Sequence, residues 1–205
     1  MKIKLSKIVV VVILLNLSVL SYSQLHTEYW LTGKKKSEVF VENNLRQGNH
    51  IFWYYNGNKE LEAIYKDDTL QGKITGWYKN NQIQFIGFYE NGKKSSKWQF
   101  YFENGKPKRQ EYYILDVPDD YWYEWYKNGK LKQKSYYVNG LLEGKWTGWY
   151  VNGNIKETGQ SVGGLKEGIW TEWWANGKKK SEIEYKNGYI ISYPKYWWSN
   201  GRLED

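Results

Sequence analysis

The sequence predicts an all-β protein built from a repeating β-hairpin unit that forms one long, twisted antiparallel meander sheet. The first observation is a glycine or asparagine that recurs every 24 residues without insertion or deletion. We call it the marker residue, and it occurs at Gly33, Gly57, Asn81, Gly105, Gly129, Gly153, Gly177 and Gly201. The second observation is a pair of turn signals in each unit, and the third is the lack of helical periodicity after residue 24. Positions are counted from the marker, so Trp149 is at position −4 of Gly153.

The two turn signals divide each unit into two strands. The first turn is Asn-Gly at the marker, as in Asn152-Gly153, and the second ends 11 residues later, as in Asn139-Gly140. We expect type I′ turns at these Asn-Gly pairs, because both central residues of that turn need a positive φ. The segments between turns are about seven residues long and rich in Trp, Tyr, Phe, Ile and Thr, which favour strands. We therefore expect about 15 strands, and at about 4.8 Å per strand a twisted ribbon of roughly 70 Å.

The pattern weakens only at Ile114–Asp120, where the second turn lacks glycine and Pro118 removes a donor from the strand ladder. An altered turn, a bend or a seam between domains would each explain this segment. Because the 24-residue register continues through it, we expect a local bend within one continuous domain.

The first 23 residues have the features of a secretory signal peptide. Lys2, Lys4 and Lys7 precede the apolar run 8–15, and Ser21 and Ser23 provide small residues before a cleavage site. A retained membrane anchor is the alternative, but the apolar run is shorter than the roughly 20 residues that cross a bilayer. We expect a repeat domain over residues 24–205, of seven to eight units, exported to the periplasm, the cell surface or the medium, with no transmembrane span after cleavage. The chain has no cysteine, which excludes disulfides and thiolate chemistry.

The 13 tryptophans occupy only three positions of the repeat, −7, −4 and −3. Side chains alternate between the faces of a strand, so positions −7 and −3 share one face and position −4 lies on the other. We expect position −7 to be shielded and position −4 to be largely accessible, as an aromatic binding surface. The residues at position −4 form the −4 column, which is the candidate binding face and consists of Trp53, Trp77, Tyr101, Trp125, Trp149, Trp173 and Trp197. The alternative is that this column packs only against itself.

A second candidate surface is a basic rim that follows the first turns along one edge of the ribbon. It consists of Lys34, Lys35, Lys36, Lys106, Lys108, Lys130, Lys132, Lys178, Lys179 and Lys180. Such lysines would attract an anionic membrane surface or an acidic glycan. The alternative is that they keep the turns soluble and discourage pairing of sheet edges.

Two stretches carry a resemblance to a known repeat family. Gly144–Tyr150 reads G-K-W-T-G-W-Y and Gly168–Trp174 reads G-I-W-T-E-W-W, and both are followed by x-N-G. They resemble the MORN repeat, and more closely the bacterial variant associated with antitoxin-like proteins, over about residues 26–205. The resemblance implies a β-hairpin repeat with a binding or scaffolding role and no catalytic residues.

The sequence offers little that supports catalysis. His26 and His50 both occupy position −7, where we expect histidine to replace tryptophan in a ladder, since equivalent positions about 9.6 Å apart cannot share one zinc ion. Glu38, Glu62 and Glu182 recur at position +5, as expected of cross-strand partners for lysine rather than of a glycosidase pair. We therefore expect no enzyme activity, no cofactor and no metal.

Two hypotheses for function follow. The first is a non-catalytic, exported scaffold that binds a protein or an anionic envelope or glycan surface, with no nucleic acid as partner. The second is an antitoxin or immunity protein that neutralises one toxin. A carbohydrate-active enzyme is the least supported reading.

Overall fold

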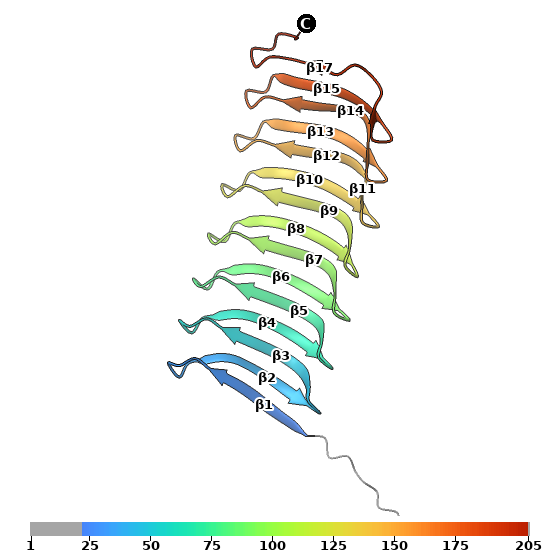
Figure 1. The fold of residues 1–205 in the computed structure, drawn as a ribbon. Helices are drawn as coiled ribbons and strands as arrows, with labels where there is room; N and C mark the ends of the chain where they lie inside the picture. The colour runs from blue at the N-terminus through green and yellow to red at the C-terminus, as the bar shows by residue number, and fades with distance from the viewer. Residues whose placement is uncertain (1–21, 205) are drawn as a thin grey trace, which may run out of the picture.

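The computed structural model describes residues 22–204, and in this part of the chain the protein is one antiparallel sheet of 17 strands without a helix. The long strands pair with one another in the order of the sequence, so the hairpins succeed one another along the ribbon in Figure 1. The predicted all-β meander is confirmed. The signal peptide predicted over residues 1–23 lies, up to residue 21, outside the described residues.

The strands of the first half are β1 (Ser23–Tyr29), β2 (Lys35–Glu42), β3 (Leu45–Trp53), β4 (Lys59–Lys66), β5 (Thr69–Trp77), β6 (Ile83–Glu90), β7 (Lys93–Tyr101) and β8 (Pro107–Ile114). Those of the second half are β9 (Val117–Trp125), β10 (Leu131–Val138), β11 (Leu141–Leu142), β12 (Gly144–Trp149), β13 (Ile155–Val162), β14 (Leu165–Trp173), β15 (Lys179–Lys186), β16 (Tyr189–Ile190) and β17 (Lys195–Tyr196). β11 and β12 together take the place that one long strand has in the other repeats, and both pair with β10.

The two kinds of turn differ in geometry. At the second turns both central residues have positive φ, as at Asn139 (49°) and Gly140 (83°), which is the type I′ geometry that was predicted. At the first turns only the marker glycine has positive φ, as at Gly153 (100°). There Gly153 N donates to Tyr150 O at 2.9 Å and Tyr150 N donates to Asn154 O at 2.8 Å, which describes a type I turn followed by a left-handed glycine. The type I′ prediction is therefore wrong for the first turns.

The asparagine before the marker explains this difference. Asn152 Oδ1 accepts a hydrogen bond from Asn154 N at 3.0 Å, and Asn152 Nδ2 donates to Ala175 O of the next first turn at 2.7 Å. The side chain thus closes its own turn and joins it to the next repeat. Asparagine at this position supplies both hydrogen-bonding groups, and the positive φ falls to the marker residue, which is glycine or, in one repeat, Asn81 (φ 67°).

The segment around Pro118 contains neither a seam nor a special bend. Leu115 (φ 50°) and Asp116 (72°) form the same two-residue turn as the other repeats, and Tyr113 pairs with Pro118 in register. The β8–β9 register shift at Gln110/Tyr112 recurs in other repeats. The expected local bend is therefore wrong, and the altered turn keeps ordinary turn geometry.

Proline is tolerated because the strand N–H at this position is not needed by the ladder. In an equivalent position, Arg46 N donates at 2.9 Å to Oδ1 of Asp68 in the next second turn. The turn next to Pro118 has Gly140 instead, which offers no side-chain acceptor, while Gly140 N donates to Pro118 O at 2.7 Å. Pro118 therefore costs no hydrogen bond at its own site.

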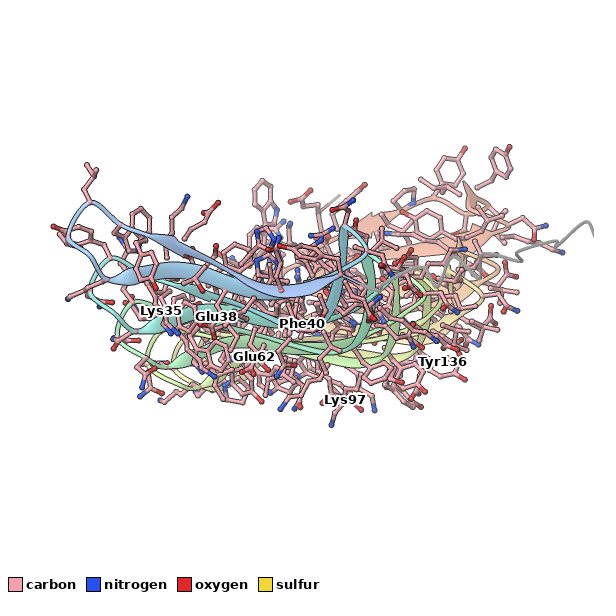
Figure 2. The ribbon with its side chains drawn as sticks, turned by 90° about the horizontal axis from the view of Figure 1, so that it is seen from below. Lys35, Glu38, Phe40, Glu62, Lys97 and Tyr136 are labelled. Carbon is pink, nitrogen blue, oxygen red and sulfur yellow. The ribbon has the colours of Figure 1, made fainter. Side chains whose placement is uncertain are left out.

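The curved sheet has two different faces. Figure 2 shows the strands bowed, with Lys35, Glu38, Phe40, Glu62, Lys97 and Tyr136 on the outer side of the bow, which we call the convex face. The opposite, concave face carries positions −7 and +8 and the hydrophobic core. The core consists of Ala63, Ile74 and Trp98, with Leu61, Tyr65, Leu70, Phe85, Tyr89, Phe100 and Tyr113 packed around them.

Glycine at position +6 after one marker residue determines how deeply the tryptophan at position −7 before the next marker residue is buried. A Cβ on Gly87 would lie 2.3 Å from the Trp98 ring, and a Cβ on Gly159 would lie 2.1 Å from the Trp170 ring. These two indoles are only 3% and 6% exposed, because each lies directly against a backbone without a side chain. Trp122 and Trp146 occupy the same position in other repeats and are half-buried.

Candidate binding surfaces

A ladder of hydrogen bonds along the first turns ties each repeat to the next. The aromatic side chain at position −3 donates to the backbone carbonyl of the next residue at position −4, for example from Tyr126 Oη to Trp149 O at 2.6 Å and from Trp174 Nε1 to Trp197 O at 2.9 Å. Tyr or Trp at position −3 supplies the polar hydrogen for this bond, and Phe102, at the same position, cannot form it. Sequence reasoning identified the aromatic position but not this bond.

The basic rim is largely engaged within the protein. Lysines at position +1 donate to the backbone carbonyl at the next first turn, as Lys106 does to Asn128 O at 3.1 Å and Lys130 to Asn152 O at 2.6 Å. Lys34 and Lys178 make the same bond. These ammonium groups thus stabilise the stacking of turns.

The other rim lysines divide between the two faces. At position +2, Lys35 and Lys179 form ion pairs with Glu38 and Glu182 on the convex face. At position +3, the lysines pair with a glutamate at position −5, in the pairs Lys36–Glu28, Lys132–Glu124 and Lys180–Glu172, each at 2.9 Å. Lys108 lies 5.9 Å from the centre of the Phe102 ring.

These ion pairs act on the titration of both partners. A hydrogen bond donated to Glu172 raises the pKa of Lys180, and a hydrogen bond from Lys179 lowers the pKa of Glu182. Both effects favour the charged forms. Much of the positive charge of the rim is therefore offset by neighbouring carboxylates, which weakens its attraction for an anionic partner.

All seven residues of the −4 column are half-buried. We expected Trp125, Trp149 and Trp173 to be largely accessible, and this prediction is wrong. The difference in exposure between positions −4 and −7 is smaller than predicted. Toward the ends of the column a lysine from the preceding repeat also lies over the ring: Lys35 Nζ is 5.6 Å from the ring centre of Trp53, and Lys179 Nζ is 5.3 Å from that of Trp197.

Threonines beside the column, at position −6, are shielded as well. Thr147 and Thr171 are both 8% exposed, because their position −6 lies in the middle of the strand between residues of adjacent strands. Trp170 is shielded as expected, while Trp122 and Trp146 are only half-buried.

Sequence reasoning missed an exposed apolar stripe on the second-turn side of the ribbon. Its residues occupy positions +9 and −12, which face each other across the hairpins in the pairs Ile114–Val117, Val138–Leu141 and Val162–Leu165. We call the turn-edge stripe the set Ile114, Val117, Val138, Leu141, Val162, Leu165 and Tyr189, whose members are 37% to 78% exposed.

Among the described residues of the N-terminal half only Leu45, which is 38% exposed, has the character of this stripe, so the row itself is confined to the C-terminal half of the protein. The corresponding cross-hairpin pairs of the N-terminal half are Glu42–Leu45, Lys66–Thr69 and Glu90–Lys93. The repeat thus keeps its backbone and changes the chemistry of this edge halfway along the ribbon. Apolar residues on both sides of the second turns at 115–116, 139–140 and 163–164 were the signal in the sequence that could have found the stripe.

The two histidines differ in environment. His50 is buried and stacks on Phe52 with ring centres 4.1 Å apart, so it takes a place in the aromatic ladder as expected. Burial lowers the pKa of His50, and the nearby charge of Arg46 lowers it further. His26 is exposed. Across residues 22–204 no group of three potential ligand side chains is arranged to hold a metal ion.

No helix in the described part of the chain is long and apolar enough to cross a membrane.

Comparison with known proteins identified a family for the repeats. The model of the MORN repeat variant matches residues 70–91, 94–114, 121–139 and 166–187. No curated protein matches the chain. The matched segments fall on the hairpins β5–β6, β7–β8, β9–β10 and β14–β15, in phase with the 24-residue period, and the protein is therefore a MORN-variant repeat protein.

Proposed function

We propose that this protein is a non-catalytic, exported scaffold that binds a protein partner of the cell envelope through its turn-edge stripe. The MORN-variant repeats support the scaffold role. The observation that carries the binding role is the exposure of seven large apolar side chains in one continuous row. Water-exposed apolar rows of this length are typical of interaction surfaces.

The chemistry of the stripe favours a protein over an anionic glycan. Its pairs consist of Ile, Val and Leu, which gain free energy mainly when another apolar surface covers them. The basic rim has many of its lysines already paired and lies on the opposite, first-turn edge. Export is inferred from the N-terminal residues 1–23, which have the features of a signal peptide.

The test is capture of partners from the envelope fraction by the mature protein and by two variants. Replacement of both Val162 and Leu165 by lysine places charge in the stripe, and we expect it to abolish capture of the specific partner. Thr69→Lys is the matched control, because Thr69 occupies the same position as Leu165 in a polar part of the edge. Unchanged capture by the double variant would refute the proposal.

Salt dependence separates this interface from one formed by the basic rim. Apolar contact should persist as ionic strength rises, whereas binding through exposed lysines should weaken. If the captured protein is a toxin whose activity the scaffold blocks, the antitoxin hypothesis replaces the envelope scaffold.

A further inference from the structure

A polar pocket interrupts the apolar packing of the concave face. It lies among β8, β9 and β10 and has a volume of about 200 Å³. Its lining includes Arg109, Glu111, Trp122, Glu124, Gln133 and Ser135. In the preceding repeats the same face is filled by the hydrophobic core.

Glu111 is the most unusual residue of this pocket. It occupies position +6, where other repeats have small or aliphatic residues such as Ala63 and Gly87, and it is only 3% exposed. Arg109 Nε forms an ion pair with Glu111 Oε1, and Tyr113 Oη donates to Glu111 Oε2 at 3.0 Å. A buried carboxylate is costly unless it is paired, so the site is built around this charge.

Ser135 gives an independent indication of a ligand. It is 1% exposed, and its Oγ has no hydrogen-bond partner among the described residues. A buried hydroxyl without a partner is unfavourable, because it has given up its hydrogen bonds to water without replacement. In this pocket the Oγ is available to both donate to and accept from a bound molecule.

Aromatic rings form the apolar wall of the pocket. The Trp122 ring centre lies 5.3 Å from that of Tyr113 and 4.8 Å from that of Tyr137. In the strand before Trp122, position +6 is occupied by Glu111, and Trp122 remains half-buried. In the strand before Trp98 the same position is Gly87, and Trp98 is buried against it. Part of the indole surface is therefore left for another group to cover.

The charges around the pocket cancel in pairs. Arg109 pairs with Glu111, and Lys132 Nζ lies 2.9 Å from Glu124 Oε1. A ligand with a net charge would have to be accommodated beside a charge of the same sign, so the arrangement favours a neutral molecule. It must carry several groups that donate and accept hydrogen bonds, together with an apolar surface that packs on an aromatic ring.

We propose that this pocket binds one ring of a neutral sugar. Sugar hydroxyls match the carboxylates, guanidinium, amide and hydroxyl of the lining, and the C–H surface of the ring matches the indole. The pocket is small enough to select a single ring. This site is separate from the turn-edge stripe, so it stands independently of the proposed protein partner.

The experiment is a titration of the mature protein with glucose, galactose, mannose and N-acetylglucosamine, followed by ligand-observed NMR and tryptophan fluorescence. The protein should bind at least one of these sugars with a dissociation constant of about 1 mM, as expected for a ligand of this size. Glucuronate is the charged comparison and should bind more weakly. No saturable binding of any neutral probe up to about 50 mM, or preferred binding of glucuronate, would overturn the proposal.

Variants locate the site. Glu111→Gln and, as a milder change, Gln133→Ala should each weaken binding tenfold or more. Glu157→Gln is the control, because Glu157 lies on the same face at the position that Gln133 has in its repeat, but outside this pocket. If Glu111→Gln fails to fold, Gln133→Ala decides. Unchanged affinity in every folded pocket variant would show that sugar binds elsewhere and refute the assignment.

Discussion

Replacing Gly159 by alanine tests whether glycine at position +6 creates the seat of a buried tryptophan. The added Cβ would lie 2.1 Å from Cδ2 of Trp170. Because carbon atoms in contact prefer a separation of about 3.5 Å, the indole or the strand must move by about 1.4 Å. Trp170 is 6% exposed, and its Nε1 donates to Gln160 O at 2.9 Å, so little space is available for that movement.

The expected cost follows from opposing contributions. Overpacking of a core typically costs about 1–3 kcal/mol, and loss of the indole hydrogen bond adds about 1 kcal/mol. Alanine recovers about 0.5–1 kcal/mol relative to glycine in a strand, because the unfolded chain has less freedom to lose. We therefore expect Gly159→Ala to lower the free energy of unfolding by about 2 kcal/mol.

Urea denaturation followed by circular dichroism measures this change, and a second background identifies its cause. The natural pair Ala63–Ile74 shows that alanine fits when the facing residue is isoleucine. In a Trp170→Ile background, Gly159→Ala should therefore become neutral or stabilising. A wild-type stability for Gly159→Ala, or the same penalty in both backgrounds, would refute the steric explanation.

Three further predictions concern the turns, the histidine and the ladder. Gly153→Val should lower the free energy of unfolding by about 1 kcal/mol or more, because a β-branched residue resists a φ of 100°, and an unchanged urea midpoint would contradict this. Burial lowers the pKa of His50 below its unfolded value of about 6.5, so its contribution to stability is present above that pH and is lost as pH falls through the folded pKa. His50→Phe should therefore reduce the acid sensitivity of the urea midpoint while His26→Phe, at an exposed site, leaves it unchanged. Tyr126→Phe should cost about 1 kcal/mol in the same assay, since it removes the bond to Trp149 O, and no loss would argue against the ladder.

The architecture could be predicted because its signals are local. Asn139-Gly140 specifies a tight turn through its own backbone preferences, and its recurrence at a fixed spacing defines a meander before any contact is known. The first turns illustrate the limit of this reasoning. Asn152-Gly153 has the same two residue types, but the Asn152 side chain donates a hydrogen bond to Ala175 O in the next repeat. That long-range contact accompanies a different turn type.

The candidate surfaces were harder to predict because they depend on register between strands. Burial of Trp98 depends on Gly87, 11 residues earlier, and alternation within one strand does not reveal that partner. The accessibility of the −4 column was overestimated for the same reason, since the lysine over Trp53 comes from the previous repeat. The turn-edge stripe becomes visible only when residues on both sides of each second turn are paired across the hairpin.

The absence of insertions in the 24-residue period has a physical explanation in the bonds between repeats. Tyr150 Oη reaches Trp173 O, 23 residues away, and Lys130 Nζ reaches Asn152 O, 22 residues away. One additional residue between these partners would displace the donor from its carbonyl and move every following side chain to the other face. The frame is therefore restricted to one length, while positions that make no bond between repeats can change their chemistry. Glu111 and the turn-edge stripe occupy such positions, which is why binding specificity in this fold is expected where a repeat departs from its neighbours and not where it matches them.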